Sequence, residues 1–111
     1  MILKSSKEID IMRTNNKILA ELLTSLKEII KPGITPLDID KISDEFITKK
    51  GGYPGFKNYN GFPNAVCASI NQTVIHGIPN KIPLNEGDII SIDVGIIKND
   101  FWGDTAYTYR I

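Results

Sequence analysis

Asp93 and Asp104 are the residues best placed for joint chemistry, because they lie on either side of a short polar segment. The sequence around Asn99-Asp100 alternates β-branched and aromatic residues with small ones, which is typical of an antiparallel hairpin. A two-residue loop would place Gly95 opposite Asp104, and Asp93 would then project from the same face with its Cβ about 7 Å away. Two carboxylates this close repel each other unless a cation lies between them. The pair therefore predicts a divalent metal site.

Each candidate residue also has a plainer interpretation. Asp93 could be a structural aspartate that caps a loop or pairs with a lysine, although an unpaired charge in an Ile/Val-rich strand is costly. Asp104 could be a turn residue. His76, the single histidine, could be structural, could bind a substrate amide or could ligate a metal. Cys67 could be a buried small hydrophobe, since no second histidine is available to activate it as a nucleophile.

Four aromatic residues lie in a segment rich in Gly, Pro and Asn, which we expect to be an ordered loop over residues 53–64. Their side chains could pack the loop onto the rest of the fold or could wall an apolar pocket. The spacing leaves both interpretations open. The four are Tyr53, Phe56, Tyr59 and Phe62.

Two helices are predicted ahead of this loop. Ser5 and Glu8 form a capping box before an apolar stripe that reaches Ile30, where a Lys-Pro-Gly segment stops the helix. Thr35 is the expected N-cap of the second helix, with proline at its first position, and Gly51 follows its end.

Three strands are predicted after the loop, and together with the helices they define an α+β fold. Residues 65–75 alternate apolar and small polar types, and the hairpin supplies the other two strands. Because helices precede strands along the chain, we expect the two helices to cover one face of an antiparallel sheet.

The composition indicates one ordinary globular domain over residues 1–111. The chain has 13 basic and 13 acidic residues and 41% hydrophobic residues, which argues against a basic nucleic-acid platform or an anionic-membrane binder. No apolar stretch has the length of a signal peptide or a membrane span. A single cysteine excludes an internal disulfide. We therefore expect a cytoplasmic protein.

An ordered set of motifs resembles type I methionine aminopeptidase over nearly the whole chain. Each motif is short, but their order and approximate spacing both match. The motifs are Lys31-Pro32-Gly33, Asn60-Gly61-Phe62-Pro63, Cys67-Ala68-Ser69-Ile70-Asn71, His76-Gly77-Ile78-Pro79, Gly87-Asp88-Ile89, Ser91-Ile92-Asp93-Val94-Gly95 and Gly103-Asp104-Thr105.

The resemblance implies a pita-bread metallopeptidase that removes the initiator methionine through a water activated by two divalent metal ions, which could be cobalt, manganese, iron or zinc. It implies that Asp93 chelates one metal and that Asp104 bridges both. His76 would act in catalysis and contact the substrate. The resemblance also places Tyr59, Phe62 and Cys67 around the methionine side chain, and Asn71 near a monovalent-cation site.

The resemblance also implies that this chain is the N-terminal half of such a domain, with the other metal ligands in an absent C-terminal half. We therefore expect the isolated chain to be inactive. The expected partner is a peptide or nascent protein that begins with methionine, with the ribosome as a further candidate, and the exposed sheet edge favours self-association. Two alternatives remain open: a non-catalytic peptide- or ribosome-binding module of the same fold, and a prolidase or X-Pro aminopeptidase.

Overall fold

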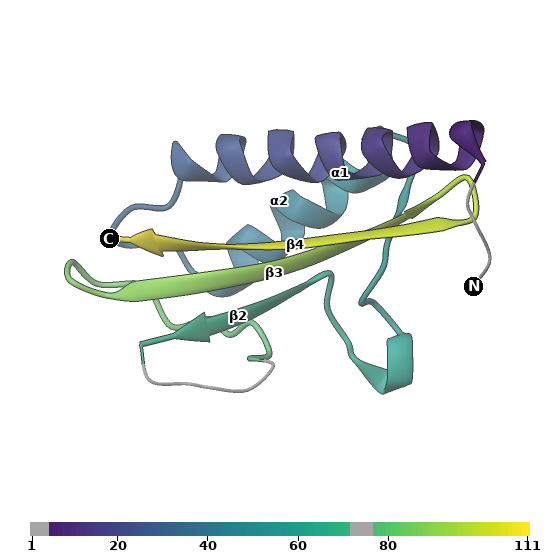
Figure 1. The fold of residues 1–111 in the computed structure, drawn as a ribbon. Coiled ribbons are helices and arrows are strands. Elements are labelled where there is room, and N and C mark those ends of the chain that lie inside the picture. The colour runs from purple at the N-terminus through teal and green to yellow at the C-terminus, as the bar shows by residue number, and fades with distance from the viewer. Residues whose placement is uncertain (1–4, 72–76) are drawn as a thin grey trace.

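A layer of two helices packs on a layer formed by one antiparallel sheet (Figure 1). The computed structural model describes residues 5–71 and 77–111. The helices are α1, Ser6–Lys27, and α2, Pro36–Lys49. The four strands are β1, Tyr53–Pro54; β2, Val66–Ile70; β3, Ile89–Lys98; and β4, Phe101–Arg110, and a short 3-10 helix, η1, spans Tyr59–Gly61. This arrangement confirms the predicted α+β fold.

Both helices begin where the sequence predicts. The Ser5 hydroxyl accepts the Glu8 backbone N–H at 3.2 Å, and the Glu8 carboxylate accepts the Ser5 N–H at 3.1 Å. Thr35 and Asp38 form the same reciprocal pair at the start of α2. These capping boxes satisfy backbone donors that have no partner inside the helix.

The first helix is shorter than the apolar stripe predicts, since α1 ends at Lys27 and not at Ile30. The Ile29 N–H bonds to the Leu26 carbonyl at 3.0 Å, which tightens the final turn and ends the α-helical pattern. Ile30 nevertheless keeps only 6% of its surface exposed. The apolar stripe therefore predicted the burial of Ile30 correctly but placed the end of α1 too late in the sequence.

Strand β3 is the centre of the sheet, because it pairs antiparallel with each of the other three strands. The two-residue strand β1 was not predicted and lies within the expected loop. Strand β2 spans Val66–Ile70, and the next residue, Asn71, takes a left-handed backbone conformation with φ 55°. Residues 72–75 of the predicted strand lie outside the described residues.

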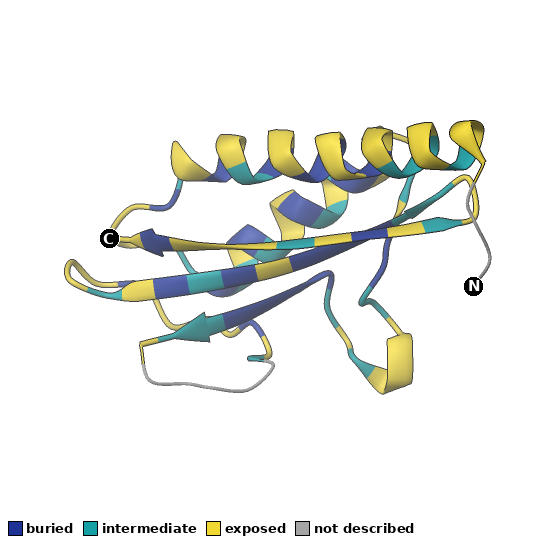
Figure 2. Ribbon diagram, viewed as in Figure 1, coloured by how far each residue is buried: buried dark blue, intermediate teal, exposed yellow. Residues whose placement is uncertain are grey.

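One face of β3 faces the helices and the other is open. Alternate residues of β3 on the helix side are completely buried, and they form the core with apolar residues of α1 and α2. Figure 2 shows the resulting alternation of buried and exposed residues along the strands. The four residues concerned are Ile90, Ile92, Val94 and Ile96.

The hairpin that joins β3 to β4 has the predicted two-residue turn. Lys98 pairs with Phe101, and both Asn99 (φ 52°) and Asp100 (φ 66°) have positive φ angles. Positive φ at both central positions defines a type I′ turn, whose twist matches that of the flanking strands. This turn is compatible with the pairing register that continues along the whole hairpin.

Candidate metal centre

The register places both aspartates on the open face of the sheet. Asp104 lies opposite Gly95, and Asp93 lies two residues from Gly95 on the same strand. Residues opposite one another in an antiparallel pair project to the same side, so the two carboxylates are diagonal neighbours. Both aspartates are exposed, and Gly95 has no side chain between them. This geometry agrees with the arrangement that the sequence predicts.

The two aspartates do not by themselves make a complete metal site. Among residues 5–71 and 77–111, no group of three or more His, Cys, Asp or Glu side chains is placed to hold a metal ion. Carboxylate oxygens suit hard divalent cations, so the chemistry of the pair fits a metal. A site of useful affinity nevertheless needs further ligands, because two carboxylates leave most coordination positions to water.

Cys67 lies beside the carboxylate pair. It pairs with Asp93 across β2 and β3, and therefore faces the open side of the sheet. The residue retains 6% of its surface exposure. Burial, with a smaller contribution from the Asp93 charge, raises the pKa of the thiol to about 11. Cys67 is consequently a neutral thiol at physiological pH, which suits contact with an apolar side chain and not nucleophilic attack.

Aromatic side chains gather on the same open face at the end nearest the turn. Trp102, two residues before Asp104 on β4, contacts Tyr59 edge-to-face at a centroid distance of 5.6 Å. Phe56 lies 6.4 Å from the same indole ring. The structure therefore brings Tyr59 into the neighbourhood of the carboxylates. Phe62, the other predicted pocket residue of this loop, is partly buried at the end of η1.

Asn71 differs from the aspartates because its side chain already has partners in the protein. The side chain of Asn71 bonds within the protein: its Oδ1 accepts the Ile89 N–H at 3.0 Å, and its Nδ2 donates to Asp88 at 3.2 Å. Asn71 therefore ties the end of β2 to the start of β3. His76 lies outside the described residues, so its predicted role stays a prediction.

Asp40 is a positioning residue that sequence reasoning missed. Its Oδ1 accepts the backbone N–H groups of Ala65 (2.8 Å) and Val66 (3.0 Å), and its Oδ2 accepts from the Asn64 side chain at 3.0 Å. One carboxylate on α2 therefore holds the start of β2, which carries Cys67. Position 40 lies between apolar positions of the helix, and its carboxylate gave no sign of a partner 25 residues away.

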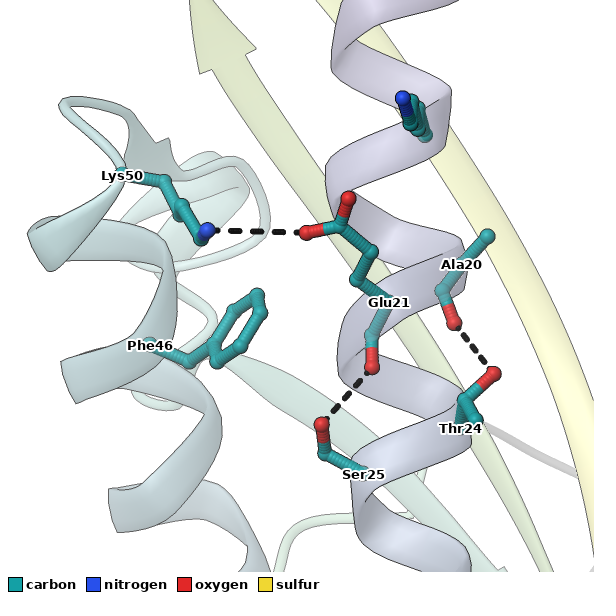
Figure 3. A pocket seen from close by; sticks show the side chains of 7 residues that line it. Ala20, Glu21, Thr24, Ser25, Phe46 and Lys50 are labelled. Carbon is teal, nitrogen blue, oxygen red and sulfur yellow. Dashed lines mark hydrogen bonds and ion pairs between the residues drawn. The ribbon is translucent and has the colours of Figure 1, made fainter.

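One hollow among the described residues lies on the other side of the sheet. It lies between α1 and α2 and has a volume of about 490 Å³. Figure 3 shows Lys50 reaching across it to Glu21 at 3.5 Å, with Phe46 alongside. Since the helices separate this hollow from the open face, it takes no part in the aspartate site.

Solved structures and curated relatives define the class of this fold. The chain superposes on the crystal structure of methionine aminopeptidase from Rickettsia prowazekii with a TM-score of 0.95 and 38% identity, over 99% of this chain and 44% of that chain. A prolidase from Pyrococcus furiosus gives a TM-score of 0.83 at 20% identity, over 97% of this chain and 32% of that one. The second likeness concerns the fold alone. The fold is thus that of one half of a pita-bread domain.

The family follows from the sequence match. Residues 10–111 match metallopeptidase family M24, and the chain belongs to this family. A methionine aminopeptidase of Clostridium perfringens (strain 13 / Type A) is 50% identical over 111 residues, which are 100% of this chain and 45% of that protein. The chain therefore spans less than half the length of this relative. No helix among the described residues is both long enough and apolar enough to cross a membrane.

Proposed function

We propose that the polypeptide that carries this sequence is a metal-dependent aminopeptidase that removes an N-terminal methionine. The observation that carries the proposal is the placement of Asp93 and Asp104 as diagonal neighbours on one open sheet face. This arrangement occurs in a chain that is 50% identical over its whole length to a methionine aminopeptidase. The structurally similar prolidase shares only 20% of its residues with the chain, so the methionine peptidase is the better-supported activity.

In this proposal, Asp93 and Asp104 hold two divalent ions together with ligands supplied from outside the described residues. Asp93 would hold one ion, and Asp104 would contribute its carboxylate to both. When bound, such a pair of ions lowers the pKa of a water and polarises the scissile carbonyl. Manganese, cobalt, iron and zinc are all candidates, because each accepts carboxylate oxygens in protein sites.

The substrate of the proposed enzyme is the N-terminus of a peptide or nascent protein. Tyr59, Phe62 and Cys67 contact the methionine side chain, and His76 contacts the peptide near the scissile bond. Two features of the structure support this assignment: Cys67 is paired with Asp93, and Tyr59 packs on the tryptophan of the aspartate strand. A neutral thiol and aromatic rings are suitable neighbours for a flexible thioether.

The test measures hydrolysis of a Met-Ala-Ser peptide by the complete natural polypeptide that carries these 111 residues, in Mn²⁺ or Co²⁺. Asp104→Asn is expected to lower kcat/KM at least a hundredfold. A metal ion contributes several kcal/mol to transition-state stabilisation, and each 1.36 kcal/mol is a factor of about ten. Asp100→Asn is the matched control, since Asp100 lies in the turn of the same hairpin. It is expected to leave the rate within about twofold.

Three outcomes would contradict the proposal. Faster cleavage of an X-Pro peptide would identify a prolidase-type enzyme. Absence of cleavage of both peptides, with no metal binding by calorimetry, would favour a non-catalytic binding module. Appreciable cleavage by the isolated 111-residue chain would show that no ligands from elsewhere are needed. Ribosome contact and self-association through the outer edge of β4 are separate proposals, which cosedimentation and size-exclusion chromatography test.

A further inference from the structure

Asn15 is a polar residue on the buried side of α1, where it is 0% exposed. Its neighbours on that side of the helix, Ile18 and Leu19, belong to the apolar core. Burying an amide among apolar residues is unfavourable unless its hydrogen bonds are replaced. The position therefore calls for a specific partner.

The partners of Asn15 are the two residues that close the hairpin. Its Nδ2 donates to the Lys98 carbonyl at 3.1 Å and to the Phe101 carbonyl at 2.9 Å. Lys98 and Phe101 face each other across the turn. One amide group consequently bridges both strands at the closed end, where the register of the hairpin is set. Its Oδ1 has no hydrogen-bond partner among the described residues.

The turn itself supplies only part of this register. Both of its central residues, Asn99 and Asp100, have positive φ angles. Residues other than glycine are strained in this left-handed region of positive φ, although Asn and Asp tolerate it better than most residues. An Asn-Gly turn would be relaxed at its second position, whereas this Asn-Asp turn is strained there. The hydrogen bonds from the Asn15 amide to both strands offset the strain of this turn.

The anchor lies close to the aspartates along both strands. Lys98 is five residues from Asp93, and Phe101 is three residues from Asp104. Helix α1 also approaches the backbone beside Asp104: a Cβ added to Gly103 would lie 3.3 Å from the Asn15 Cβ and 2.7 Å from the Asn16 Oδ1. The glycine therefore allows the helix to lie against the strand that carries Asp104.

We propose that Asn15 is a positioning residue for the carboxylate pair: by anchoring both strands of the hairpin, it holds Asp93 and Asp104 in the register that lets them share a metal ion. This inference rests on the proposed metal site. A slip of one residue would move Asp104 to the opposite face of the sheet, and smaller distortions would change the separation of the carboxylates. Asn15 acts through the hairpin and touches neither substrate nor metal.

The test compares Asn15→Leu with the wild type in the complete natural polypeptide that carries this sequence. Leucine has a similar volume and provides no donors. Mn²⁺ affinity is measured by electron paramagnetic resonance, and exchange of the hairpin amides is measured by hydrogen–deuterium exchange. We expect Asn15→Leu to weaken Mn²⁺ binding about tenfold, the lower end of the loss seen for groups that orient metal ligands. We also expect faster exchange of the amides between Asp93 and Asp104.

Ile30→Val is the matched control. Ile30 lies beyond the far end of α1 and is 6% exposed, so its truncation lowers stability without contact with the turn. Its Mn²⁺ affinity is expected to stay within twofold of wild type. If Asn15→Leu does not fold, Asn15→Ser is the second variant. Its hydroxyl can donate to only one of the two carbonyls. An intermediate loss of Mn²⁺ affinity is expected for it.

The outcomes separate the inference from the proposed function. If the wild type binds Mn²⁺ and the Asn15 variant that folds binds it with the same affinity, the positioning role is overturned and the proposed metal site remains. Equal weakening by Ile30→Val would also overturn it, because loss of stability alone would then explain the effect. A wild-type protein that binds no Mn²⁺ would overturn the proposed metal site, and the positioning role with it.

Discussion

The two faces of β3 differ in what they do for the molecule. On the helix side, Ile92 and its alternate neighbours are fully buried, and they hold the helices to the sheet. On the open side, Asp93 is exposed and lies near a second carboxylate. Adjacent residues of one strand therefore serve the core on one side and the proposed metal site on the other. Because side chains alternate at every residue, the two roles can be changed independently.

The largest expected effect on stability follows from truncating the buried face. Ile92→Ala should lower the free energy of unfolding by about 2–5 kcal/mol, since it removes buried methyl groups and leaves a cavity. Asp93→Asn, one residue further on, should change the same quantity by less than about 0.5 kcal/mol without metal. Urea denaturation of the two variants tests the comparison. Equal losses would show that the open face also supports the fold.

A second prediction uses Cys67 to report on the open face. With a pKa of about 11 in place of 9.0, the thiol should react with iodoacetamide at pH 8 about a hundredfold more slowly than in the unfolded chain. Asp93→Asn should lower the thiol pKa, because the Asp93 charge contributes to its shift. It should therefore speed alkylation. Burial is the larger cause of the shift, so a slow residual reaction is expected in the variant.

The same shift fixes the sign of a pH effect on stability. The pKa of Cys67 is higher in the folded state than in the unfolded state. The folded protein therefore holds the thiol proton more tightly than the unfolded chain does. The resulting stabilisation is complete below pH 9 and is lost as the pH rises from about 9 to about 11. Thermal unfolding across this range should show a steeper decrease in Tm for the wild type than for Cys67→Ala.

A modest gain in stability is expected from the turn that joins the two strands. Asp100→Gly should stabilise the chain by roughly 0.5–1 kcal/mol, because glycine adopts the positive φ of this position without strain. The open face should be unchanged, so proposed metal binding should be unaffected. Calorimetric unfolding with and without Mn²⁺ distinguishes a change in stability from a change in the site.

Local signals predicted most of the fold and the shared sheet face of Asp93 and Asp104. The capping boxes, the Asn-Asp turn and the alternation of apolar residues each depend on a few neighbouring positions, so they can be recognised directly in the sequence. The face shared by Asp93 and Asp104 was deduced from the length of the turn. The 3-10 tightening after Leu26 and the left-handed Asn71 have no such local pattern.

Long-range polar contacts were beyond the reach of sequence patterns. Asn15 occupies a position within the apolar stripe of α1, where a polar residue is a signal in itself. Its partners 83 and 86 residues away nevertheless depend on how helix and hairpin meet. Asp40 gave even less indication, because it lies at a half-exposed helical position. In both cases one side chain satisfies backbone groups of a distant segment.

The contact of α1 with β4 also has a consequence for the order in which the chain can fold during its synthesis. Helix α1 leaves the ribosome before the sheet does, yet its buried residues pack against a sheet whose last strand ends at Arg110. At a synthesis rate of 5–20 residues per second, roughly 4–17 s separate the completion of α1 from that of β4. During this interval the apolar stripe of α1 lacks its final partner and is a suitable surface for a chaperone to shield.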